Sequence, residues 1–174
     1  MPKCLGSVVF LLFLLVPVVY AQDALEEARR LFLSGQYVQS IEATGRVIKA
    51  HPDDVRLAAE ANYLVGANYL NLFDFLTAKK NFLTVVGKYK SSAYYEDAYL
   101  GLGDVEFLQE NFDQALKVYE EFLATRPSKK RLATLYFRLA EVHLKLGNLE
   151  KSKGYVQRLQ SEFPDSFEAR DAKR

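Results

Sequence analysis

Hydrophobic and polar positions in residues 98–127 follow a pattern that predicts two short amphipathic helices joined by a tight turn. In the second helix the hydrophobic positions fall at i, i+3, i+7 and i+10, on one helical face. This spacing appears four times, about 37 residues apart, and such a period is typical of arrays of helical hairpins. The recurring positions form four columns: Tyr37, Phe75, Phe112 and Leu149; Ser40, Ala78, Ala115 and Ser152; Thr44, Phe82, Tyr119 and Val156; Val47, Val85, Phe122 and Leu159.

Small residues recur where the two helices of a unit should face each other. The first helices align on four such positions: Ala28, Gly66, Gly103 and Ala140. We expect Gly103 and Ala115 to let two helix backbones approach closely, because neither carries a bulky side chain. The large residues Phe112, Tyr119 and Phe122 would then fill the space above and below that contact.

Prolines mark the ends of three of the four units. Pro127 ends a second helix, because proline lacks a backbone N–H and clashes with the preceding turn. Pro52 and Pro164 occupy matching places, and Lys90 stands at this place in the second unit.

This pattern resembles the tetratricopeptide repeat. The family pattern is matched in the third unit by Leu102, Gly103, Ala115, Tyr119 and Pro127, and in the fourth by Leu139, Ala140, Gly147, Leu159 and Pro164. The resemblance implies an all-α fold, an α-solenoid of about four helical hairpins with a short C-terminal capping helix. The units are expected at residues 23–52, 55–90, 93–127 and 130–164, and the cap at residues 166–173. An irregular helical bundle with chance periodicity is the alternative.

Turn and capping residues are expected at the helix ends. Gly35 and Gly147 suit the left-handed backbone conformation that commonly ends a helix. In the second unit Phe73 stands where glycine is usual, which departs from the pattern. N-caps are expected from polar side chains just before the helices: Asp53 or Asp54, Ser91 or Ser92, Ser128, and Ser166.

Residues 1–21 are predicted to be a secretory signal peptide. Lys3 and the terminal amine supply the positive charge, residues 8–19 are apolar, and Val19 and Ala21 are small residues at the cleavage positions, so cleavage is expected before Gln22. The alternative is an uncleaved membrane anchor. Because Cys4 precedes the apolar run, it is not in the place of a lipid-attachment cysteine.

Removal of the leader would change both the charge and the cysteine content, and the cysteine content favours a periplasmic location. The chain has 23 Lys and Arg against 22 Asp and Glu, and loss of Lys3 with the leader would make these numbers equal. Cleavage would also remove the single cysteine, so the mature chain would have no disulfides and its stability would come from packing. A secreted chain without cysteine suits a bacterial periplasm better than a small extracellular module.

Candidate catalytic chemistry is sparse, so no catalytic, cofactor-binding or metal-binding residues are predicted. His51 precedes Pro52 in a loop, and His143 is a single histidine inside a helix. Metal-binding histidine or cysteine motifs and a glycine-rich phosphate loop are missing. The pairs Glu120-Glu121 and Asp53-Asp54 are interpreted as solvated helix or cap residues, and no small-molecule substrate is expected.

Nucleic-acid binding is not expected because the chain is close to neutral. The basic triplet 129–131 lies at a helix start, where positive charge opposes the helix dipole. We interpret it as a surface patch, with contact to an acidic partner as the alternative.

The resemblance implies that stacked hairpins curve and that their first helices line a concave groove, which would hold an extended peptide or a partner helix. The candidate groove residues are Tyr63, Asn71, Asp97, Asp104, Phe107, Phe137, Glu141 and Lys145. Asp104 and Glu141 would repel a carboxylate ligand. The alternative is that Leu100, Phe107 and Phe137 are partly buried by neighbouring units.

The long repeat and the ending 162–166 resemble bacterial envelope members of the family, namely the periplasmic Tol-Pal coordinator and the repeat lipoprotein of the outer-membrane assembly machine. This resemblance implies a non-enzymatic scaffold that binds envelope proteins, with membrane contact only if the leader is retained. The alternative is a peptidoglycan-associated accessory protein, in which Tyr94, Tyr95 and Tyr99 stack on sugars.

Overall fold

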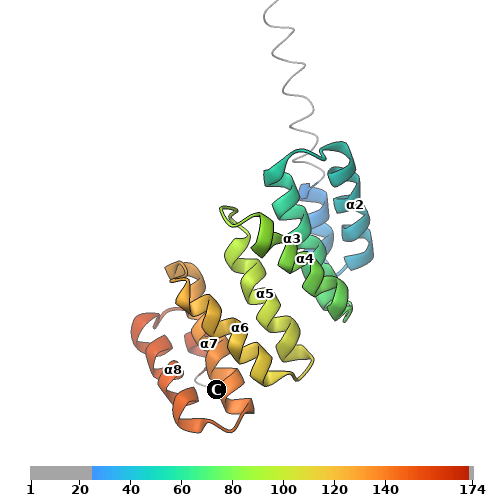
Figure 1. Ribbon diagram of the computed structural model, residues 1–174. Coiled ribbons are helices and arrows are strands. Elements are labelled where there is room, and N and C mark those ends of the chain that lie inside the picture. Colours follow the sequence, from blue (N-terminus) through green and yellow to red (C-terminus); the bar gives the residue numbers. More distant parts are fainter. Residues whose placement is uncertain (1–24, 173–174) are drawn as a thin grey trace, which may run out of the picture.

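The computed structural model describes residues 25–172, and this part of the chain is helical without strands (Figure 1). Residues 25–33 form a first helical segment. The helices that follow are α2 (Tyr37–Ala50), α3 (Val55–Asn71), α4 (Phe75–Lys88), α5 (Tyr95–Leu108), α6 (Phe112–Ala124), α7 (Lys129–Lys145), α8 (Leu149–Glu162) and α9 (Phe167–Asp171). No helix in this range is both long and apolar enough to cross a bilayer. The predicted signal peptide and its cleavage position lie outside the described residues.

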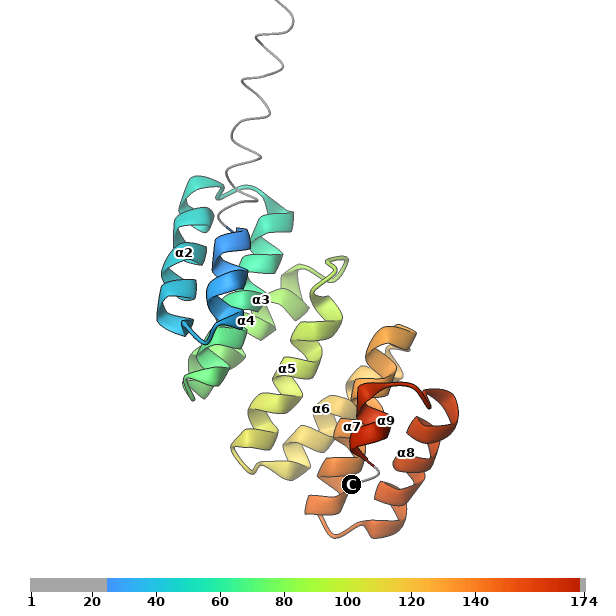
Figure 2. The ribbon, with the colours of Figure 1, turned by 180° about the vertical axis from the view of Figure 1, so that it is seen from behind.

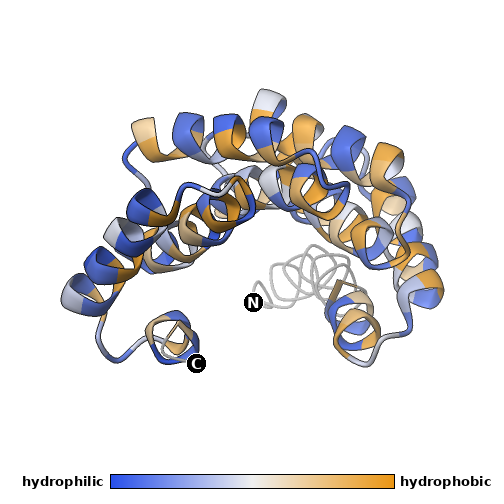
Figure 3. Ribbon diagram, turned by 90° about the horizontal axis from the view of Figure 1, so that it is seen from below, coloured by the Kyte–Doolittle hydropathy of each residue, from blue (hydrophilic) through white to orange (hydrophobic). Residues whose placement is uncertain are grey.

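The helices form consecutive antiparallel hairpins that stack into a curved array, as predicted. The hairpins are 25–33 with α2, α3 with α4, α5 with α6, and α7 with α8. Successive first helices contact each other, α3 with α5 and α5 with α7, whereas no two of the described second helices α2, α4, α6 and α8 do. The array therefore curves toward its first helices, and Figure 3 shows the resulting arch.

Inside each hairpin the column of small residues, Ser40, Ala78, Ala115 and Ser152, contacts the first helix. Ser40 donates its hydroxyl proton to the backbone carbonyl of Ala28, and Ser152 donates to that of Ala140, both at 2.8 Å. Ala78 and Ala115 occupy this column in the middle hairpins and are fully buried. The second and fourth columns, and the third apart from half-buried Val156, are therefore confirmed as the interior of the hairpins. The first column is only half-buried, and its Leu149 is 54% exposed.

Gly103 has a different role from the one expected. A Cβ added at Gly103 would lie 2.0 Å from a ring atom of Tyr119, so the glycine makes room for that ring rather than for a helix backbone. Gly66 stands in the same relation to Phe82, at 2.8 Å. Both rings are buried.

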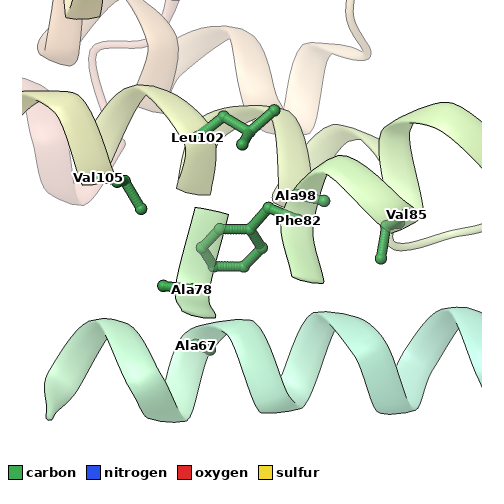
Figure 4. Packing of buried hydrophobic residues seen from close by; sticks show 7 residues of the cluster. All are labelled: Ala67, Ala78, Phe82, Val85, Ala98, Leu102 and Val105. Atoms are coloured by element: carbon green, nitrogen blue, oxygen red, sulfur yellow. The ribbon is translucent and has the colours of Figure 1, made fainter. Parts of the chain in front are cut away.

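Phe82 also joins the second hairpin to the third. Its ring lies between α3 and α5 (Figure 4), and a Cβ at Gly101 of α5 would come within 2.7 Å of it. The surrounding cluster draws Ala67 from α3 and Ala98, Leu102 and Val105 from α5. Because a single hairpin cannot bury its own apolar face, this shared core holds neighbouring repeats together.

Each hairpin turn ends the first helix with a residue in the left-handed region. Gly35 and Gly147 have φ of +75°, as expected, and Phe73 and Glu110 adopt φ of 59° and 61° without being glycine. At all four places two backbone bonds of the Schellman type close the turn, for example Glu110 N–H to Phe107 O at 3.0 Å and Asn111 N–H to Glu106 O at 2.9 Å. The backbone geometry of the turn is thus the same in each repeat even where the residue type differs.

Replacing Glu110 with glycine should therefore stabilise the protein by about 1 kcal/mol, because glycine carries no steric penalty in this conformation. Chemical denaturation of the purified chain measures the change. Glu110→Ala is the control, since it removes the carboxylate but keeps the Cβ. A gain shared by both variants would show that backbone strain is not the cause.

The predicted N-caps are only partly confirmed. Asp54 caps α3, with its carboxylate accepting from the N–H groups of Arg56 and Leu57. The prediction for the third unit was wrong, because Tyr94 precedes α5 and the Ser92 hydroxyl accepts from Tyr94 N–H instead. Ser128 does occupy the N-cap position of α7, but its hydroxyl donates to the Glu96 carboxylate.

The last helix, α9, covers the end of the stack, as predicted (Figure 2). Ser166 caps it by accepting from Ala169 N–H at 3.0 Å. Ala169 is fully buried against Ala133, Tyr136 and Leu159 of the last hairpin. The helix thus takes the place that the first helix of a further repeat would occupy.

Candidate partner-binding groove

Three of the predicted groove residues meet in one pocket on the concave side. Asn71, Asp104 and Phe107 lie at the ends of α3 and α5 that face the hairpin turns. The pocket has a volume of about 350 Å³, and we call it the groove pocket; its lining is Leu70, Asn71, Phe73, Asp104, Phe107, Leu108 and Arg138. Its wall is mainly apolar, with an amide and an ion pair at its edge.

The charge of the groove pocket differs from the expectation. Asp104 is not a free carboxylate, because it accepts from the Tyr119 hydroxyl at 2.6 Å and pairs with Arg138 at 2.8 Å. Arg138 also donates to Glu141 at 3.0 Å. Burial, and next the nearby charge of Asp104, raise the pKa of Tyr119, so the hydroxyl stays protonated and donates to the carboxylate. The negative charges of Asp104 and Glu141 are therefore neutralised in part by the Arg138 guanidinium.

Asp97 also forms an ion pair within the protein. Its carboxylate pairs with Arg131 of α7 at 2.5 Å, and both side chains are largely buried. Burial raises the pKa of Asp97, and the facing guanidinium opposes that rise. The basic triplet 129–131 is thus not simply a surface patch, since one of its members joins two first helices.

Tyr63 lines a smaller pocket toward the start of the array, with a volume of about 170 Å³; its lining is Arg29, Phe32, Leu33, Glu60, Tyr63, Leu64 and Tyr94. The Tyr63 ring stacks on Tyr94 with centroids 5.4 Å apart. Burial, and next the charge of Asp97, raise the pKa of Tyr63 to about 12. The structure therefore separates Tyr63 from the groove pocket.

The remaining predicted positions differ in exposure. Leu100 is buried at 7% exposure, while Phe107 and Phe137 are half-buried, so neighbouring units do cover these apolar residues in part. Phe137 packs against the cluster under α9, away from the groove pocket. Lys145 is exposed at the end of α7. Of the eight predicted residues, only Asn71, Asp104 and Phe107 share one pocket.

Sequence reasoning missed Phe73, Leu108 and Arg138. Phe73 was considered only as a turn residue, yet it is 70% exposed at the rim of the groove pocket. Arg138 could have been found from its distance along the chain, because opposite charges 34 residues apart recur between adjacent first helices. Arg131 and Arg138 each follow their aspartate by 34 residues.

The tyrosines considered for sugar stacking lie largely against other rings of the protein. Tyr99 stacks on Phe122 with centroids 5.1 Å apart, and Tyr95 meets Tyr99 edge-on. Tyr94 stacks on Tyr63. All three are half-buried rather than exposed.

His143 is buried at 1% exposure, beneath Tyr155 of α8. Its ring is parallel to that of Tyr155 within 13°, and its Nδ1 has no hydrogen-bond partner among the described residues. Within residues 25–172 no cluster of three or more histidine, cysteine or acidic side chains is arranged to hold a metal ion.

Stability should decrease in mild acid because of His143. Burial, and next the nearby Lys151, lower the pKa of His143 in the folded state. The unfolded chain therefore binds the proton first, so stability is full above about pH 6.5 and falls as the pH drops toward the lower folded pKa, by at most about 1.4 kcal/mol per pH unit.

Urea unfolding at pH 7.5 and 5.5 tests this, with His143→Phe as the variant and His51→Gln as the control. His143→Phe should lose less stability between the two pH values than wild type does. An equal loss in all three proteins would contradict the prediction.

Comparisons with known proteins agree with this architecture. Two family models described as Tetratricopeptide repeat match residues 66–130 and 106–174, and together they span residues 66–174. No curated protein matches the sequence.

Solved structures are similar over most of the chain. A thermophilic TPR protein of Thermus thermophilus is 23% identical and superposes with a TM-score of 0.67, covering 87% of this chain and 78% of its own. A crystal structure of MamA is 21% identical with a TM-score of 0.63, covering 83% and 79% respectively. At these identities the likeness shows the fold alone.

Proposed function

The chain belongs to the tetratricopeptide repeat family, and we propose that it is a non-enzymatic scaffold that binds a segment of another protein in its concave groove. The observation that carries the proposal is the groove pocket, an open, mainly apolar hollow that spans three successive first helices. Its volume of about 350 Å³ is at the lower end of the range for binding pockets and leaves room for one anchoring side chain.

The chemistry of the pocket suggests what kind of segment binds. Phe73 and Leu108 are 70% and 48% exposed and would be covered by an apolar side chain of the partner. Asn71 uses its NH₂ group on the Ala67 carbonyl at 2.8 Å, which leaves its side-chain oxygen to accept from a partner N–H. Because Asp104 and Arg138 neutralise each other, the segment need not carry a charge to match them.

Site-specific photocrosslinking tests the groove. A benzoylphenylalanine at position 71 should crosslink a polypeptide in cells, whereas one at position 83, on the outward-facing α4, should not. The combined substitution Phe73→Ser/Leu108→Ser should reduce the adduct at least fivefold. Leu76→Ser is the matched control, because Leu76 is 82% exposed and does not line the groove pocket.

Equal adducts from positions 71 and 83, or an adduct unaffected by Phe73→Ser/Leu108→Ser, would remove the groove from the proposal. Substitution of Asp104 is not a suitable test, because its carboxylate holds Tyr119 and Arg138 in place.

We further propose that the scaffold acts in the bacterial cell envelope. The support is the N-terminal sequence, in which Lys3 precedes an apolar run and small residues stand at positions 19 and 21. N-terminal sequencing of the protein isolated from its native host should begin at Gln22. A sequence that begins at residue 1 or 2 in the membrane fraction would favour the anchored alternative.

A further inference from the structure

A second pocket lies on the opposite, outer side of the array. The second helices α6 and α8 do not contact each other, and α7 forms the floor between them. The pocket has a volume of about 340 Å³, and we call it the outer pocket; its lining is Glu120, His143, Lys151, Gly154, Tyr155 and Arg158. It shares no residue with the groove pocket.

The floor of the outer pocket carries a polar atom without an internal partner. His143 is buried at 1% exposure, and its Nδ1 accepts from or donates to none of the described residues. Buried polar atoms are nearly always hydrogen-bonded, so an unpartnered nitrogen on a residue that lines a pocket calls for an explanation.

In the preceding repeat the buried polar side chain at the equivalent position has hydrogen-bond partners. Glu106 stands one repeat before His143 and is also buried, at 4% exposure. Lys79 of α4 pairs with its carboxylate at 2.5 Å, and Asn111 donates to it at 3.2 Å. One repeat on from Lys79 stands Leu116, which offers no hydrogen bond to His143. The lysine partner is therefore missing at His143, whereas Asn148 keeps the place of Asn111.

Charged residues from both second helices line the outer pocket together with His143. Glu120 projects from α6, and Lys151 and Arg158 project from α8. The ion pairs of α8 among the described residues are Lys153 with Glu150 and Arg158 with Glu162, so Lys151 takes part in neither. The pocket thus combines an ammonium outside these pairs, a carboxylate and an imidazole.

We propose that the outer pocket binds a peptide residue that carries a carboxylate close to a backbone N–H. Lys151 pairs with the carboxylate and the Glu120 carboxylate accepts from the N–H, above the buried His143 on the pocket floor. Glu120 disfavours a dianion such as phosphate, which would bring two negative charges against its own. The carboxylate comes from a chain terminus or from an acidic side chain, and the experiment distinguishes these sources.

The test is a titration followed by NMR of the full-length chain with its histidine rings labelled, because the sequence contains only His51 and His143. The probes are N-acetylglycine for a terminal carboxylate, N-acetylglutamate amide for a side-chain carboxylate, N-acetylglutamine amide for neither, and inorganic phosphate. At least one carboxylate probe should shift the His143 ring signals without shifting those of His51. The glutamine probe should have no effect.

Matched variants check the assignment of Lys151. Lys151→Gln should weaken binding of the active probe at least fivefold, whereas Lys153→Gln, two residues along the same helix, should leave it unchanged.

Three results would overturn the proposal: His143 signals that respond to no carboxylate probe, an equal response to the glutamine probe, or an equal effect of the two lysine substitutions. A response to phosphate alone would overturn the assignment of the ligand as a carboxylate. Photocrosslinking from position 71 remains an independent measurement, so failure here does not affect the proposed groove.

Discussion

Substituting Gly103 with alanine should lower the free energy of unfolding by about 3 kcal/mol, the upper end of the usual range for overpacking. The added Cβ would lie 2.0 Å and 2.5 Å from two atoms of the Tyr119 ring. The ring cannot move aside easily, because it is fully buried and its hydroxyl donates to Asp104 at 2.6 Å. Chemical denaturation measures the loss.

Gly45→Ala is the matched control, since a Cβ at Gly45 of α2 meets no atom within 4 Å. This substitution should stabilise the chain by about 0.5–1 kcal/mol through helix propensity alone. In a Tyr119→Leu background, Gly103→Ala should become much less harmful, because the clashing ring is gone. Equal effects of Gly103→Ala in both backgrounds would show that Tyr119 is not the obstacle.

Removing the ring of Phe82 should lower the free energy of unfolding by about 3–5 kcal/mol, the usual range for truncating a buried aromatic residue. Phe82 belongs to α4 but packs against α3 and α5, so Phe82→Ala leaves a cavity between two repeats. Hydrogen exchange should accelerate in both α3 and α5, and not only in the hairpin that contains the substitution.

Leu76→Ala provides the control on the same helix, because Leu76 is 82% exposed and its truncation should change stability by less than about 0.5 kcal/mol. If exchange accelerated in α3 alone after Phe82→Ala, the ring would not be the connection between the repeats.

The sequence pattern was sufficient to predict which residues form the interior of the hairpins. Ala115, Tyr119, Phe122 and Leu159 are buried as their columns indicated. A periodic pattern identifies the face of a helix that is covered, but not the atom that covers it. For that reason the role of Gly103 was misjudged, because the sequence does not show that the Tyr119 ring lies over it.

The groove was predicted less well than the interior, for a related reason. Asp104 was correctly expected on the first helices, but its partner Arg138 lies on the next first helix, and only the stacking brings the two together. Phe73 was considered only as a departure from the turn pattern. The two Schellman bonds hold the turn, and the Phe73 side chain lines the groove pocket.

Helix α9 also determines how long this array can become. It buries Ala169 against Ala133, Tyr136 and Leu159, and its Glu168 accepts from Thr134 across a separation of 34 residues, as contacts between successive first helices do. Without residues 166–172, the apolar surface of Ala133, Tyr136 and Leu159 would be exposed, and the first hairpin of a second copy could pack against it. Because such a head-to-tail contact can repeat from one copy to the next, the truncated chain would be prone to self-associate.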